Sequence, residues 1–170
     1  MNDIRRDLER RRRADCVALL ESVVAHTPGG IRGTAVFMLD VDRRAAPVDV
    51  VSELVEPLLP EIARRLSVAA PNWHRLLLGE DGQFIVIAQG LVDGGAVLGC
   101  AARLVHAYDD ALQVADTAVG DVSIGIAFSP QHGARADALL RAAESGLREA
   151  IAVARSGRGM KAAASADDVS

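Results

Sequence analysis

The sequence predicts an α/β domain in which helices surround a central, mixed, mostly antiparallel sheet of about five strands, with one helix at the N-terminus. Short apolar runs bounded by turn residues are typical of buried strands, and they occur at residues 34–39, 84–88 and 122–128. Longer segments such as 137–155 repeat apolar residues at helical spacing. The pair Asp81-Gly82, between two strand-like runs, predicts a hairpin because glycine adopts positive φ without a Cβ clash.

The length and composition indicate one cytoplasmic domain. The chain has 170 residues, and we expect an N-terminal helix within residues 1–30, the domain at 31–160 and a disordered tail at 161–170. A net charge of −4 gives no reason to expect nucleic acid or an anionic membrane as a partner. Cys16 and Cys100 are too few for a disulfide scaffold and lack metal-ligand spacing. No apolar run approaches the length that spans a membrane.

The N-terminal segment, residues 3–26, predicts a helix with an arginine-rich first half and an apolar stripe in its second half. Its most basic part is the run Arg10, Arg11, Arg12 and Arg13. Two interpretations stand side by side. The run either forms a solvated helix face, which the interleaved acids support, or binds phosphate or an acidic partner.

The strand at 34–39 leads into Asp40 and Asp42. Alternation along an extended chain places these two carboxylates on the same side. Paired acids at a strand end are candidate ligands for a hard cation such as Mg²⁺, and the alternative is that they cap a helix or lie in a loop.

The remaining segments fill out the fold. Helical spacing predicts helices at 47–55, 57–68, 96–108 and 137–155, with a looser stretch at 109–120. Gly125, inside the strand at 122–128, predicts close approach of a neighbouring element. This order of elements predicts helices mainly on one side of the sheet and around its ends.

The hairpin at residues 75–88 organises the chain. Its polar tip, residues 79–83, carries two acids between apolar strands. A polar tip on a rigid sheet is a common place for chemistry, and the alternative is a tight turn with solubilising residues.

Taken in order, these motifs resemble the GGDEF domain, the nucleotidyl-cyclase-like palm of bacterial diguanylate cyclases. The run 37–42, Phe-Met-Leu-Asp-Val-Asp, is similar to the family's first strand, and 122–127, Val-Ser-Ile-Gly-Ile-Ala, to a later one. Glu80, Asp81, Gly82, Gln83 and Phe84 stand where the family has Gly-Gly-Asp-Glu-Phe. The resemblance implies that Asp40 takes the place of a metal ligand.

This sequence departs from the family at its signature. Glu80 and Asp81 occupy the positions of the two glycines that let the backbone approach the nucleotide. Gln83 replaces a metal-binding acid, and a neutral amide is a poor substitute where two Mg²⁺ ions must be held. A shift of the turn by one or two residues would let Glu80 or Asp81 supply a carboxylate.

The resemblance also locates the residues that bind nucleotide elsewhere in the family. The base-reading positions fall near Val48 and Pro57, which cannot hydrogen-bond a base edge. The phosphate-binding lysine falls on Ile151, or on Ala154 or Arg155 with an extra turn. The product-binding Arg-x-x-Asp motif is absent from residues 71–74.

From these departures we expect a catalytically inactive GGDEF-like domain that acts as a regulatory or protein-interaction module in cyclic di-GMP-type signalling. We expect no catalytic residue and no cofactor, apart from Mg²⁺ at Asp40 as a candidate. The predicted partners are another protein or a second copy of the chain, with Arg10–Arg13 and the hairpin tip as candidate surfaces. One alternative is a sensor that binds GTP or cyclic di-GMP without turnover, using unfamiliar phosphate ligands such as Arg64 and Arg65. Residual cyclase activity is the other.

Overall fold

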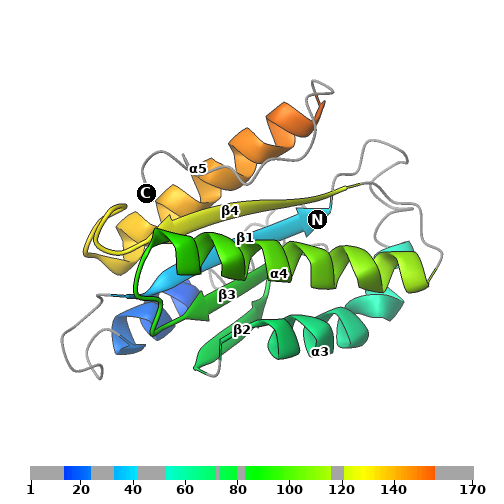
Figure 1. Cartoon of the computed structure of the whole chain (residues 1–170), viewed down its shortest axis with the longest axis horizontal. Helices are drawn as coiled ribbons and strands as arrows, with labels where there is room; N and C mark the ends of the chain where they lie inside the picture. Colours follow the sequence, from blue (N-terminus) through cyan, green and yellow to red (C-terminus); the bar gives the residue numbers. More distant parts are fainter. Residues whose placement is uncertain are drawn as a thin grey trace.

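The computed structural model describes residues 14–23, 33–41, 53–71, 73–79, 83–115 and 121–155. Residues 14–23 and 53–55 are helical. The other elements, labelled in Figure 1 except for the short 3-10 helix η1, are β1 (Ala35–Val41), η1 (Glu56–Leu58), α3 (Leu59–Ala69), β2 (His74–Leu78), β3 (Phe84–Ala88), α4 (Gly94–Val114), β4 (Val122–Phe128) and α5 (Ala136–Arg155).

The sheet has the strand order β2-β3-β1-β4, so that β1 and β3 are its central strands. Each neighbouring pair is antiparallel, with Phe37 opposite Val86 in β3 and opposite Ile126 in β4. The predicted α/β architecture, built on an antiparallel sheet, is therefore confirmed. In the described part of the chain the sheet has four strands and no parallel pair, which refines the expectation of about five strands in a mixed sheet.

Helices cover both faces of the sheet, which corrects the expectation that they lie mainly on one side. Alternate residues of β1 face opposite ways: Phe37 and Leu39 belong to a core with α3 and α4, whereas Val36 and Met38 belong to a core with α5 and the helix at 14–23. Figure 1 shows α4 crossing in front of the strands. The physical reason is that a strand apolar at every position exposes hydrocarbon on both faces, so each face needs its own helical layer.

Helix α5 approaches β4 most closely at Gly125. A Cβ added there would lie 2.0 Å from the carbonyl oxygen of Ala143 and 2.4 Å from the backbone nitrogen of Leu147. Both atoms belong to the helix backbone, so the helix rests directly on the strand. This confirms the close approach that the sequence predicts for Gly125.

Helix α4 is longer than the sequence predicts. It begins after Asp93, whose side chain accepts a hydrogen bond of 2.8 Å from the backbone N–H of Ala96, and ends at Val114. The expected looser stretch at 109–120 is therefore helical in its first part. Ala111 and Leu112 are buried in the same core as Leu104, so packing on the sheet extends the helix.

The cysteines and the apolar character of the helices can be examined directly. Cys16 and Cys100 are both buried and do not form a disulfide with each other, and burial raises the pKa of Cys100. Of the helices that the structure describes, none combines the length and the apolar character that crossing a bilayer requires. The arginine run at 10–13 and the predicted tail at 161–170 lie outside the described residues.

Candidate functional site

The candidate site lies where β1 ends in the middle of the sheet. Asp40 is half-buried there, and its Oδ1 accepts a hydrogen bond of 2.8 Å from the backbone N–H of Val41. Ser123 is the residue directly opposite Asp40 in β4. Ser123 is fully buried, and its hydroxyl has no hydrogen-bond partner in the part of the chain that the structure describes. The sheet therefore places an acid next to a buried hydroxyl.

On the other side of β1, the register brings Gln83 beside Asp40. The pairing of β1 with β3 ends with Leu39 opposite Phe84, and one further step in the same register sets Asp40 opposite Gln83. Directly opposite residues project from the same face of a sheet. Met38, two residues before Asp40, belongs to the core under α5. Gln83, Asp40 and Ser123 thus form a polar row on the α5 side of the sheet.

The hairpin between β2 and β3 is closed at its base by Gly79 and Gln83. The backbone N–H of Gly79 donates to the carbonyl oxygen of Gln83 over 2.7 Å. A Cβ on Gly79 would lie 2.7 Å from Oε1 of Gln83 and 3.2 Å from its Cβ. The side chain of Gln83 therefore lies against Gly79, a position at which the sequence carries no signal for this contact.

The structure tests only part of the predicted site. It places Asp40, Gln83 and Phe84, and the β1–β3 register, carried one residue past its last pair, sets the first two opposite each other. The other predicted residues lie outside the described part of the chain: Asp42, Glu80, Asp81, Gly82 and Arg10–Arg13.

The described side chains at this site that could coordinate a cation are one carboxylate (Asp40), one amide (Gln83) and one hydroxyl (Ser123). Hard divalent cations favour carboxylate oxygens, and two Mg²⁺ ions that hold a triphosphate need more than one acid. The residues described at the Gln83–Asp40–Ser123 row therefore do not fit a two-magnesium centre. In the six described stretches, no three His, Cys, Asp or Glu side chains gather as a metal site would require.

The segment expected to lack the product-binding motif makes contacts within itself. Nδ1 of His74 lies 2.8 Å from the carbonyl oxygen of Pro71, and the guanidinium of Arg75 lies 5.1 Å from the centre of the Trp73 ring. Of the other positions assigned by resemblance, Pro57 is exposed in η1 and Ala154 is buried in α5, so neither presents a polar group to a ligand.

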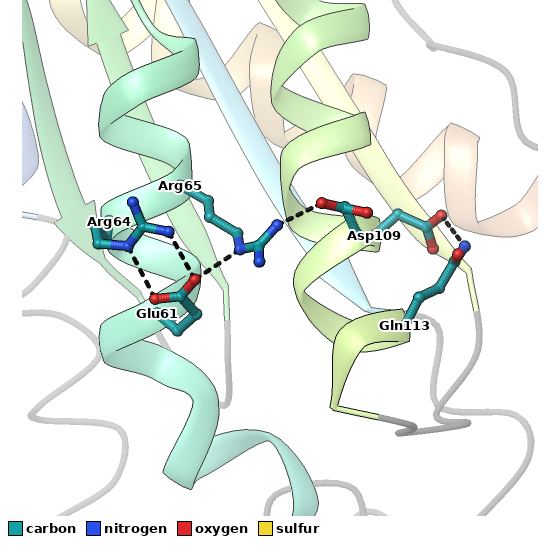
Figure 2. A network of polar contacts seen from close by, with 6 residues as sticks. Glu61, Arg64, Arg65, Asp109 and Gln113 are labelled. Atoms are coloured by element: carbon teal, nitrogen blue, oxygen red, sulfur yellow. Dashed lines mark hydrogen bonds and ion pairs between the residues drawn. The ribbon is translucent and has the colours of Figure 1, made fainter.

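A second polar cluster, shown in Figure 2, joins α3 to α4. Glu61 accepts two hydrogen bonds from Arg64, of 2.8 and 2.9 Å, and one of 2.7 Å from Arg65. Arg65 also forms an ion pair with Asp110 of α4. Sequence spacing can indicate the pairs with Glu61 but not the contact between helices. Both arginines are already paired with acids, which argues against their serving as phosphate ligands.

The two arginines of this cluster change the pKa of the Glu61 carboxyl group. The hydrogen bonds from Arg64, and then those from Arg65, lower the pKa of Glu61 to about 2. Because the pKa is lowered on folding, the ionised carboxylate contributes stability above the unfolded pKa of about 4.3. That contribution is lost as the pH falls toward 2.

We therefore expect Glu61→Gln to lower the melting temperature at pH 7, and the difference from the wild type to shrink between pH 4.5 and pH 2. Thermal unfolding followed by circular dichroism across this range measures it. Asp137→Asn is the matched control, since Asp137 pairs with Arg141 at 3.2 Å one turn along the same helix and with Arg135 at 3.3 Å just before that helix. A difference for Glu61→Gln that is constant down to pH 2 would contradict the assignment.

The strand order, the helices on both faces and the acid beside a hairpin together define a GGDEF-like fold. Comparison with solved structures shows this fold directly. The chain is similar to an EAL/GGDEF domain protein from M. capsulatus, with a TM-score of 0.60 and 23% identity over 83% of this chain and 89% of that one. It is also similar to the GGDEF domain of YfiN from Pseudomonas aeruginosa, with a TM-score of 0.59 and 21% identity over 82% and 86%.

A longer protein also contains this fold. The S helix-GGDEF-EAL part of LapD from Vibrio cholerae, bound to c-di-GMP, matches with a TM-score of 0.58 and 15% identity. The match covers 84% of this chain and 32% of that one, so this chain spans about a third of it. No family model and no curated protein matches the sequence.

Proposed function

We propose that this protein is a non-catalytic GGDEF-like module that regulates a partner by direct contact in cyclic di-GMP-type signalling. The observation that carries the proposal is the position of Gln83. A neutral amide stands opposite Asp40 at the base of the hairpin, where a metal-dependent cyclase would use a second carboxylate.

The expected loss of reaction rate supports a site that does not synthesise cyclic di-GMP. Removing one group that stabilises a transition state typically costs a factor of about 10²–10³ in rate. Here the sequence changes a metal acid to Gln83 and also puts Glu80 and Asp81 in place of two glycines, which adds bulk and negative charge where a triphosphate would lie. Because these effects fall on binding as well as on chemistry, synthesis should be negligible.

The signalling context rests on the fold. The similar structures include GGDEF domains from several bacteria and a GGDEF-EAL protein that carries c-di-GMP. A domain that keeps the fold without the chemistry can still present a surface to a partner, and function is decided by such sites rather than by the fold. We therefore assign this chain a regulatory role, with protein contact as its mechanism.

The first test is synthesis. Incubation of the full chain with GTP and Mg²⁺ should yield no cyclic di-GMP by chromatography, with an active GGDEF domain at the same concentration as the positive control. Asp40→Ala should behave as the wild type does. Product formed by the wild type and abolished by Asp40→Ala would overturn the proposal and restore the cyclase interpretation.

The second test is binding. Calorimetric titration with GTP and with cyclic di-GMP should show no saturable heat that corresponds to a Kd below about 50 μM. If GTP or cyclic di-GMP binds more tightly than this, and Asp40→Ala weakens the binding, the proposed interaction module is wrong and the nucleotide sensor is supported. Heat of dilution alone, with a folded protein by circular dichroism, supports the proposed function.

A further inference from the structure

Among the strands that the structure describes, β2 is an edge of the sheet and pairs only with β3. Two backbone hydrogen bonds fix which of its backbone groups face β3. Gly79 N–H donates to Gln83 over 2.7 Å, and the carbonyl oxygen of Trp73 accepts from Gln89 over 3.3 Å. Because backbone groups alternate in direction along a strand, residues 73, 75, 77 and 79 point toward β3. His74, Leu76 and Leu78 point away from it.

The outward backbone groups of Leu76 and Leu78 have no hydrogen-bond partner within the described residues. The carbonyl oxygen of His74 accepts one bond of 3.2 Å from the side chain of Arg75. Edge strands are normally protected by charged side chains, proline, a bulge or a covering element. This strand, His-Arg-Leu-Leu-Leu, has one charged residue, Arg75, and neither proline nor a bulge in its pairing with β3, and Leu78 is 49% exposed.

We propose that β2 pairs antiparallel with β2 of a second copy of this chain, about a two-fold axis at Leu76. In this register Leu76 lies opposite Leu76 of the second copy, and His74 lies opposite Leu78. The three outward-facing residues of each copy then form about six new hydrogen bonds. The two sheets join into one continuous sheet through an interface that is the same on both copies.

The side chains suit pairing with an identical strand. Arg75, the strand's one formal charge, falls opposite Leu77 of the second copy, so the two-fold axis sets no like charges against each other. The half-exposed Leu78 is covered by His74. Trp73, 37% exposed, falls opposite Gly79, which has no side chain to obstruct the ring. This self-complementarity favours a second copy over an unrelated strand.

The inference rests on the fold and the edge of the sheet, and it does not depend on the proposed loss of nucleotide chemistry. Its test uses no nucleotide. Failure of edge pairing would leave the proposed function standing, and detection of cyclase activity would leave edge pairing standing.

Sedimentation velocity of the full chain over a range of concentrations should show a monomer–dimer equilibrium. Leu78→Pro removes an N–H that faces outward while keeping each bond to β3, so we expect dimerisation to weaken about tenfold or more. Leu78→Ala keeps that N–H and should weaken it less. Val114→Lys, a change at a 70% exposed residue of α4, should leave the equilibrium unchanged. Equal loss in Leu78→Pro and Val114→Lys would overturn the proposal.

Amide hydrogen exchange on the wild type gives a test that needs no variant. Protection of the Leu76 and Leu78 amides should rise with protein concentration, because only the dimer bonds them, whereas Leu77 should be protected throughout. A monomer at all concentrations would overturn the inference. So would a dimer in which Leu76 and Leu78 exchange as fast as in the monomer.

Discussion

Gly125→Ala is expected to destabilise the fold by about 3 kcal/mol or more, since overpacking against a backbone that cannot move aside lies at the upper end of such costs. The new Cβ would lie 2.0 Å from the carbonyl oxygen of Ala143 and 2.4 Å from the backbone nitrogen of Leu147. To relieve both contacts, α5 would have to lift from β4. Lifting α5 would also open the core that holds Leu139 and Leu140.

Urea unfolding of the wild type and the variant measures this loss. Gly99→Ala is the matched control, because the nearest atom to its added Cβ is the end of the flexible Arg103 side chain, 3.6 Å away. Alanine inside a helix is favoured over glycine, so this control should gain about 0.5–1 kcal/mol. If both variants shift stability in the same direction, the proposed contact between α5 and β4 is wrong.

Phe84→Ala is expected to cost about 3–5 kcal/mol, as is typical for truncating a buried aromatic residue. Phe84 is 2% exposed at the first position of β3. Its ring meets that of Tyr108 edge to face, with centroids 5.7 Å apart and an interplanar angle of 81°. The variant loses this contact with α4 and leaves a cavity beside the hairpin.

The comparison for Phe84→Ala is Leu78→Ala. Leu78 lies directly opposite Phe84 in the β2–β3 register but is 49% exposed, so its truncation should cost well under half as much. Urea unfolding at low protein concentration, where self-association does not contribute, measures both variants. Equal losses would mean that Phe84 is not anchored in the core.

The contrast between adjacent residues of the hairpin shows how a residue at the candidate site can change while the fold is kept. Phe84 packs into the core, so replacing it would destabilise the fold. Gln83 is only partly buried, in the polar row with Asp40, so a change of its side chain removes less packing. Substitutions that abolish metal chemistry therefore need not disturb the sheet. Because packing does not dictate the side chain at position 83, the glutamine there bears on metal binding rather than on the stability of the sheet.

Local sequence patterns predicted most of the secondary structure. The runs at 34–39, 84–88 and 122–128 were expected as strands and are strands, because an unbroken apolar run with β-branched residues suits a sheet covered on both faces. The helix expected at 137–155 is α5, with its apolar stripe on the sheet. The sequence did not predict where α4 ends, since Ala111 and Leu112 extend it by packing on residues far away in the chain.

The sequence by itself predicted most of the helices and strands, and by resemblance it indicated that Gln83 stands where the GGDEF family has an acid. Only the tertiary structure decided that Gln83, Asp40 and Ser123 share one face of the sheet, that Arg65 bridges α3 to Asp110, and that the outward backbone groups of Leu76 and Leu78 in β2 have no partner among the described residues. The reason is physical: periodicity is a local property of the chain, whereas register and helix placement depend on contacts between residues that are distant in sequence.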